Sequence, residues 1–118
     1  MIYRIAEPKD RLWLMSKGFK KFGFPTIVAD DGELKGAIAT SDDRDFIEAH
    51  RIWASSPFIA KNLIQAYENT LLAFSIDRYV FTVKEDTEWA NMVDKSSACH
   101  IISQEGDLIT YERSLNGR

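Results

Sequence analysis

Residues 52–63 read Ile-Trp-Ala-Ser-Ser-Pro-Phe-Ile-Ala-Lys-Asn-Leu, an apolar segment that runs through Ser-Ser-Pro into a long helical pattern. Ser56 is a typical N-cap residue, and Pro57 fits the first helical position because its missing N–H would have no partner there. A helix that starts in this way leaves backbone N–H groups and a partial positive charge at its tip, which favours bound phosphate. The stretch therefore predicts a strand, a helix start and an anion-binding position, in that order.

The segment before this helix start, residues 45–54, is compatible with either a strand or a helix. As a strand it places on one face Phe46, Glu48, His50 and Ile52. As a helix it groups Phe46, Ala49, His50 and Trp53. We favour the strand, because the Ser-Ser-Pro that follows forces a break before the next helix.

Three segments have helical character. The helix predicted from Pro57 carries one apolar stripe, made up of Ile59, Leu63, Ala66, Tyr67, Leu71 and Phe74. An earlier helix is predicted from Pro8, with Leu12, Met15, Phe19 and Phe22 at helical spacing before Gly23 and Pro25 end it. A third helix is capped by Asp86 or Thr87, and one of its faces carries Trp89, Met92, Val93 and Ser96.

Besides residues 45–54, strand character occurs at residues 1–6, 26–29, 34–40, 79–83, 99–103 and 108–113. The turns Asp30-Asp31-Gly32 and Gln104-Glu105-Gly106-Asp107 predict hairpins. The small residues Gly36, Ala37 and Ala39 leave room for a close approach. The continuous run 79–83 predicts a strand covered on both faces. The chain therefore has α+β character and forms an α/β sandwich, with a mixed central sheet of about seven strands flanked by about three helices.

Composition limits the classes of function. A chain of 118 residues with 45% hydrophobic residues predicts one globular domain over residues 1–118. A net charge of −3 argues against a nucleic-acid partner. The single Cys99 fits a reducing cytoplasm, and the absence of a long apolar run argues against a membrane span. No metal site is expected, because Cys99 and His100 are neighbours on a strand and point to opposite faces.

The order of elements places the candidate site. A strand, the helix from Pro57 and the strand 79–83 form a β-α-β crossover, which brings two strands together in parallel. Ligands favour the strand ends where the connection order changes. We therefore expect the site where Ile52 and Trp53 leave the sheet.

This order resembles that of the GCN5-related N-acetyltransferase (GNAT) superfamily over nearly the whole chain. In that family a strand ends in a Gln/Arg-x-x-Gly-x-Gly/Ala turn that holds the pyrophosphate of acetyl-CoA. The matching stretch here is Ser55-Ser56-Pro57-Phe58-Ile59-Ala60. Ala60 matches the last position of the motif, and Lys61 follows as at the start of the family's helix. Two positions differ: Ser55 replaces the basic or amide residue, and Phe58 replaces the glycine. The turn from Trp53 to Lys61 is also a few residues short.

A second pattern of the family, roughly Asn-x-x-Ala-x-x-x-Tyr-x-x-x-Gly-Phe, has its counterpart in Thr87, Ala90, Asp94, Ala98 and Cys99. Only Ala90 is identical to the family residue. Asp94 stands where the family has its general-acid tyrosine. The resemblance therefore leaves that role unfilled at this position.

The resemblance implies transfer of an acetyl group from acetyl-CoA, as co-substrate, to an amine. Its catalytic candidates are Glu48 and His50 as bases and Tyr111 as a displaced general acid. Its candidate cofactor-binding residues are Ile52, Trp53, Ser55, Ser56, Phe58, Ile59, Ala60, Lys61 and Thr87. No metal takes part.

The short, divergent chain is similar to compact phage-type members of the superfamily. An alternative function is therefore that of a non-catalytic GNAT-fold phage protein that binds a host protein or belongs to the virion. The expected partners are an amine-bearing small molecule or protein, and a homodimer or a host-protein complex fits the same interpretation. The expected location is the cytoplasm, which is the host cytoplasm if a phage encodes the chain.

Overall fold

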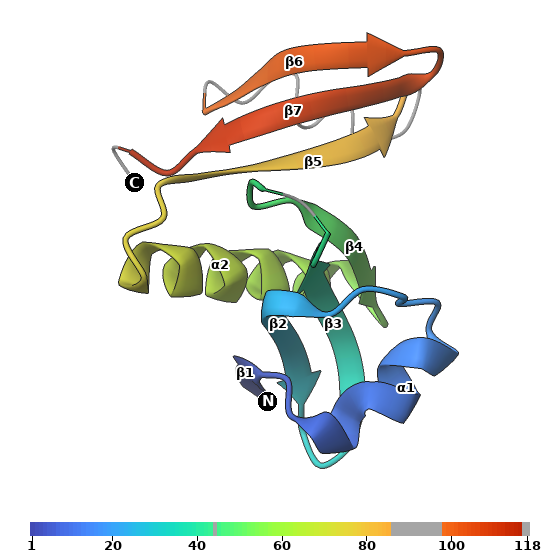
Figure 1. Ribbon diagram of the computed structural model, residues 1–118. Coiled ribbons are helices and arrows are strands. Elements are labelled where there is room, and N and C mark those ends of the chain that lie inside the picture. Colours follow the sequence, from blue (N-terminus) through green and yellow to red (C-terminus); the bar gives the residue numbers. More distant parts are fainter. Residues whose placement is uncertain (44, 86–97, 117–118) are drawn as a thin grey trace.

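The computed structural model describes residues 1–43, 45–85 and 98–116, which form two antiparallel sheets and two α-helices (Figure 1). The first sheet contains β1 (Ile2–Ile5), β2 (Gly23–Asp30), β3 (Leu34–Thr40) and β4 (Ala49–Ala54) in that order. The second sheet has the order β5 (Arg78–Lys84), β7 (Leu108–Ser114) and β6 (Cys99–Glu105). The helices are α1 (Arg11–Ser16), which follows the 3-10 turn η1 (Pro8–Asp10), and α2 (Pro57–Ala73). The predicted α+β class and the seven strands are confirmed.

The two helices cover opposite faces of the first sheet. On one face Ile27 and Ile38 pack with Leu63, Tyr67 and Leu71 of α2. On the other face Val28, Ala37 and Ala39 pack with Leu14 of α1 and with Phe19. Alternation along β2 and β3 thus divides their side chains between two cores, as a strand period of two requires.

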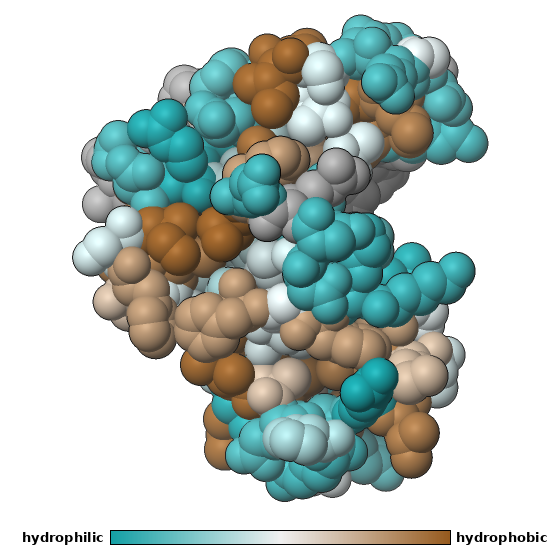
Figure 2. Space-filling model, viewed as in Figure 1, coloured by the Kyte–Doolittle hydropathy of each residue, from teal (hydrophilic) through white to brown (hydrophobic). Residues whose placement is uncertain are grey.

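Helix α2 also joins the first sheet to the second. Tyr79 of β5 and Leu115 lie in the same buried cluster as Leu63 and Tyr67 of α2. The surface is notched between the part formed by β5, β6 and β7 and the part that carries β4 (Figure 2). The helix prediction from Pro57 is confirmed, except that Phe74 caps the helix and is 58% exposed.

The helix predicted from Pro8 is wrong in length and phase. The α-helix ends at Ser16, and Gly18 then adopts φ 87°, a left-handed conformation that suits glycine. Leu12 is 81% exposed, whereas Leu14 and Phe19 are buried. Of the predicted stripe, Leu12 and Met15 are therefore exposed, whereas Phe19 and Phe22 pack on the sheet from beyond the end of the helix.

One further expectation about strands is corrected and another is confirmed. Strand β5 is covered on both faces only at its start, since Thr82 and Lys84 are exposed. The close approach predicted at Gly36 is made by α2: a Cβ on Gly36 would lie 2.8 Å from Leu63 Cδ1. The small residue there accommodates the helix.

The third predicted helix, with Asp86, Thr87 and Trp89, lies outside the described residues. So do Ala90 and Asp94 of the second family pattern.

Arg4 of β1 and Asp10 of η1 form a bidentate ion pair at the start of the chain. Arg4 Nη1 and Nη2 donate to Asp10 Oδ2 and Oδ1 at 2.8 and 3.0 Å, and the Glu7 amide donates to Oδ2 at 2.8 Å. Asp10 is 4% exposed. The hydrogen bond from Arg4 lowers the pKa of Asp10 below its usual value, against the effect of burial. The carboxylate form therefore fixes η1 against β1.

We predict that this pair makes the fold acid-sensitive. Because the pKa of Asp10 is lower in the folded than in the unfolded chain, its stabilisation is complete above the unfolded pKa of about 4. The stabilisation is lost as pH falls through the folded pKa. Asp10→Asn should cost about 1–3 kcal/mol of unfolding free energy at pH 7, measured in urea. The loss should be smaller at pH 3, and the exposed Glu33→Gln should show neither effect. An equal loss at both pH values would contradict the role of the charge.

Candidate functional site

A cleft opens between β4 and β5 because these parallel strands meet at one point only. Glu48 forms an isolated parallel bridge with Val80, and the Val80 amide donates to the Ile47 carbonyl at 2.9 Å. Beyond this bridge, within the described residues, β4 pairs with β3 alone and β5 with β7 alone. The two strand edges then face each other with backbone groups that a ligand can pair with.

An extra residue in β4 accompanies this divergence. Thr40 pairs with Ala49 and Ala39 pairs with Arg51, which leaves His50 without a counterpart on β3. A bulge of this kind bends a strand and increases its twist. Ala49 and Ile52 consequently both pack against the α2 core, so the regular alternation predicted for Glu48, His50 and Ile52 is broken.

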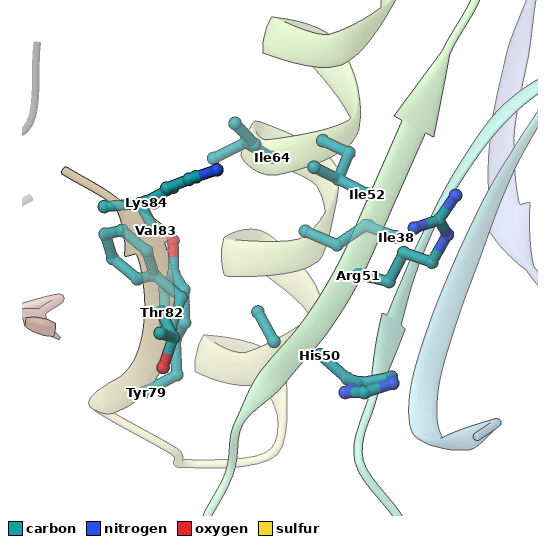
Figure 3. A pocket seen from close by; sticks show the side chains of 11 residues that line it. Ile38, His50, Arg51, Ile52, Ile64, Tyr79, Thr82, Val83 and Lys84 are labelled. Carbon is teal, nitrogen blue, oxygen red and sulfur yellow. The ribbon is translucent and has the colours of Figure 1, made fainter. Parts of the chain in front are cut away.

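The cleft has a volume of about 270 Å³ and mainly apolar walls. Its lining residues come from β3, β4, α2 and β5 (Figure 3), and they are Ile38, Ala49, His50, Arg51, Ile52, Ile64, Tyr79, Phe81, Thr82, Val83 and Lys84. Figure 3 shows Ile38, Ile52 and Ile64 between β4 and β5, whereas His50 and Arg51 extend from the other side of β4. The cleft therefore suits an elongated, largely apolar group.

The start of α2 lies at the open end of the cleft, because β4 runs away from the Glu48 bridge toward the helix. Ser56 is the N-cap, as predicted: its Oγ accepts a hydrogen bond from the Ile59 amide at 3.2 Å. The Ala60 amide donates to the Ser56 carbonyl at 3.1 Å, and the Ser55 amide donates to the Lys35 carbonyl at 2.9 Å. Most amides of the predicted phosphate-binding turn, residues 55–60, thus have partners within the protein.

A directed hydrogen-bond chain lies in the core behind the cleft-lining residues Ala49 and Tyr79. The Thr40 hydroxyl donates its proton to the Pro25 carbonyl at 2.7 Å. Thr40 Oγ1 must therefore accept the hydrogen bond from the Tyr67 hydroxyl, 2.7 Å away. Burial raises the pKa of Tyr67 to about 12, the hydrogen bond to Thr40 opposes this, and the charge of Glu48 adds to the increase. Tyr67 is thus a neutral donor at physiological pH, with the Glu48 carboxylate in its vicinity.

A buried ion pair fixes β5, the second wall, against α2. Glu68 is 3% exposed and accepts hydrogen bonds from the Tyr79 hydroxyl at 2.7 Å and from Arg113 Nη2 at 3.3 Å. Arg113 Nε also donates to Glu68. Burial, together with the charge of Glu68, raises the pKa of Tyr79. The network ties α2, β5 and β7 together beside the cleft.

Of the three predicted catalytic residues, two lie near the closed end of the cleft. Glu48 forms the bridge itself, and His50 is the extra residue of β4. Tyr111 is 1% exposed and is not among the lining residues. Its ring stacks on that of Phe81, which does line the cleft, with centroids 5.7 Å apart. Their catalytic roles stay predictions.

The predicted cofactor-binding residues are distributed between the cleft and the helix start. Ile52 lines the cleft, whereas Trp53 packs on the opposite side of β4 against Trp13, with ring centroids 5.6 Å apart. Phe58 is 71% exposed, Ile59 is buried and Lys61 is exposed. Thr87 lies outside the described residues. Contact of any of these residues with a cofactor stays a prediction.

Sequence reasoning missed the far wall of the cleft. Tyr79, Phe81 and Val83 alternate along β5, and this period of two is the signal that could have identified one ligand-facing side. The partners Glu68 and Arg113 gave no local signal, since 45 residues separate them.

Two further observations concern the described residues. Among them, no three His, Cys, Asp or Glu side chains come together as a metal site. None of their helices is long and apolar enough to cross a membrane.

Comparison with solved structures identifies the fold. An acetyltransferase of the GNAT family from Listeria monocytogenes aligns with a TM-score of 0.67 and 20% identity, over 97% of this chain and 94% of that one. A ribosomal-protein-alanine N-acetyltransferase from Brucella melitensis aligns with a TM-score of 0.67 and 12% identity, over 98% and 100% of the two chains. PaiA N-acetyltransferase from Thermoplasma acidophilum, solved in complex with coenzyme A, aligns with a TM-score of 0.62 and 15% identity, over 75% and 59%. No family model and no curated protein matches the sequence.

We predict strong energetic coupling between Glu68 and Arg113. Glu68→Leu leaves the half-buried guanidinium of Arg113 and the buried Tyr79 hydroxyl without this acceptor, which should cost about 1–3 kcal/mol in urea unfolding. The double variant Glu68→Leu/Arg113→Met should be more stable than Glu68→Leu alone, because it removes the unpaired charge. Additive losses in the double-mutant cycle would show that the pair is not coupled.

Proposed function

From the GNAT fold of this chain, we propose that it transfers an acetyl group from acetyl-CoA to an amine acceptor. The observation that carries the proposal is the cleft between β4 and β5, with its apolar walls and its two facing strand edges. The pantetheine arm of coenzyme A is an extended chain with amide and methyl groups. The amides of the arm can form hydrogen bonds with backbone groups at the strand edges. Its methyl groups can pack against Ile38, Ile52 and Phe81.

The direction of the arm follows from the shape of the cleft. The nucleotide is too large for the interior and belongs at the open end, near the start of α2. The thioester then lies toward the closed end, at the bridge between Glu48 and Val80. The backbone of Ile52 and Trp53 accompanies the arm between these two ends.

The reaction requires few groups from the protein. The amine loses a proton to a base, and its nitrogen attacks the thioester carbonyl carbon. A backbone N–H at the bulge of β4 stabilises the oxyanion, and the C–S bond then breaks. The departing thiolate takes up a proton. We assign the base to Glu48, because the side chain of His50 extends from the other side of β4.

A non-catalytic function, as a module that binds a host protein or belongs to a phage particle, is the second candidate. The satisfied amides at the start of α2 and the burial of Tyr111 favour it. The two candidates differ in one measurable property, because only the enzyme needs to bind a coenzyme A thioester.

Binding of the thioester is the first test. Titration with acetyl-CoA, followed by calorimetry and thermal unfolding, should show saturable binding. A ligand at 100 times its Kd should stabilise the fold by about 2.7 kcal/mol. Ile64→Trp fills the cleft and should abolish binding, whereas the neighbouring exposed Gln65→Trp should bind normally. No binding at millimolar acetyl-CoA would favour the non-catalytic function.

A second test concerns the base. Glu48→Gln keeps the size of the side chain but cannot accept the ammonium proton, so kcat should fall by about 10²–10⁴-fold while the Kd for acetyl-CoA is unchanged. Thiol release from acetyl-CoA with a panel of amines measures the rate. Asp45→Asn, in the exposed segment before β4, is the control. Unchanged turnover in Glu48→Gln would remove Glu48 from the mechanism.

A further inference from the structure

We infer that the cleft recognises its acyl donor through the pantetheine thioester and that the adenine nucleotide contributes little to binding. The ligand class is thus an S-acyl pantetheine thioester, whether coenzyme A or a pantetheine-bearing carrier protein supplies it. The inference rests on the proposed function and concerns the two ends of the same site.

The first argument is the hydrogen bonding of the helix start. Pro57 has no N–H, the Ile59 amide donates to Ser56 Oγ at 3.2 Å, and the Ala60 amide donates to the Ser56 carbonyl at 3.1 Å. Between Pro57 and Ala60, only the Phe58 amide remains for a ligand. A pyrophosphate carries two charged groups and needs several convergent donors to replace its water. The cap of α2 has already used them.

The second argument is the side chain that projects from this turn. Phe58 is 71% exposed, so its side chain projects from the first turn of α2 into solvent. Glycine allows the closest approach of a ligand to a main chain, and every other residue adds a Cβ. No basic residue occurs from Pro57 to Ala60, and the exposed Lys61 follows only in the next position. The turn at the start of α2 therefore offers a pyrophosphate few donors and no basic side chain before Lys61.

The third argument is that the part of the cleft proposed to hold the pantetheine arm keeps its apolar walls and its strand edges. Its apolar walls include the buried Ile38 and the half-buried Ile52 and Ile64. The strand edges of β4 and β5 diverge beyond a single bridge and face the space between them. Recognition is thus concentrated on the arm and the thioester.

A comparison of donors tests the inference. We expect the Kd and kcat/KM of S-acetyl-pantetheine to lie within threefold of those of acetyl-CoA. If acetyl-CoA binds more than tenfold more tightly than S-acetyl-pantetheine, the inference is overturned and the proposed function stays intact. Failure of both thioesters to bind would overturn both. An acetylated carrier protein serves as a third donor and identifies the source of the thioester. If its kcat/KM is higher than that of acetyl-CoA, the carrier protein is the source, and if it is lower, coenzyme A is the source.

A gain-of-function variant tests the physical cause. Phe58→Gly removes the projecting side chain and should raise the affinity for acetyl-CoA at least fivefold relative to S-acetyl-pantetheine. Gln65→Gly, an exposed position on the same helix, introduces the same backbone freedom away from the turn and should leave the ratio unchanged. An unchanged ratio in Phe58→Gly would overturn the assignment of Phe58 as the obstacle.

Discussion

The arrangement of the two sheets depends on the pairing between the β4 and β5 segments, which stops after one bridge. The Val80 amide and the Ile47 carbonyl join the two sheets, and beyond them β4 and β5 diverge. If the pairing continued, the two sheets would form one closed surface without a cleft. The extra residue His50 gives β4 the additional bend that prevents this. The cost is that backbone groups on both strand edges face a cavity, which makes this region the natural place for a ligand.

Helix α2 compensates for the missing pairing. Its buried side chains Leu63, Tyr67 and Leu71 fill the core of the first sheet, and the same cluster includes Tyr79 of the second sheet. Glu68 adds a charged contact to β7 through Arg113. A buried ion pair contributes less to stability than to specificity, because desolvation offsets much of its attraction. Together with the hydrogen bond from the Tyr79 hydroxyl to Glu68, it holds β5 and β7 against α2 beside the cleft.

The sequence predicted those parts of the fold that local chemistry decides. Ser56 and Pro57 specify the start of α2 by capping, and the Asp30-Asp31-Gly32 turn specifies the β2–β3 hairpin. The early end of α1 was missed because the apolar spacing continues past Ser16, although Gly18 ends the helix in a left-handed conformation. The extra residue in β4 was missed because Ala49-His50-Arg51 is an ordinary strand sequence, and only pairing with β3 selects the bulge. The far wall of the cleft depends on contacts between distant segments, as with Glu68 and Arg113.

The helix start and the cleft differ in where their backbone groups find hydrogen-bond partners. Ser56 supplies an oxygen from the protein itself, so the first turn of α2 is complete without any ligand. A phosphate at this position would have to compete with the Ser56 hydroxyl for the Ile59 amide, and it would gain only the difference between two hydrogen bonds. A ligand in the cleft would instead meet strand edges that no described strand pairs with, so each amide it contributes adds a new bond. The binding free energy of a pantetheine thioester should therefore come from the cleft, and the cap that stabilises α2 is itself the reason that the nucleotide end adds little.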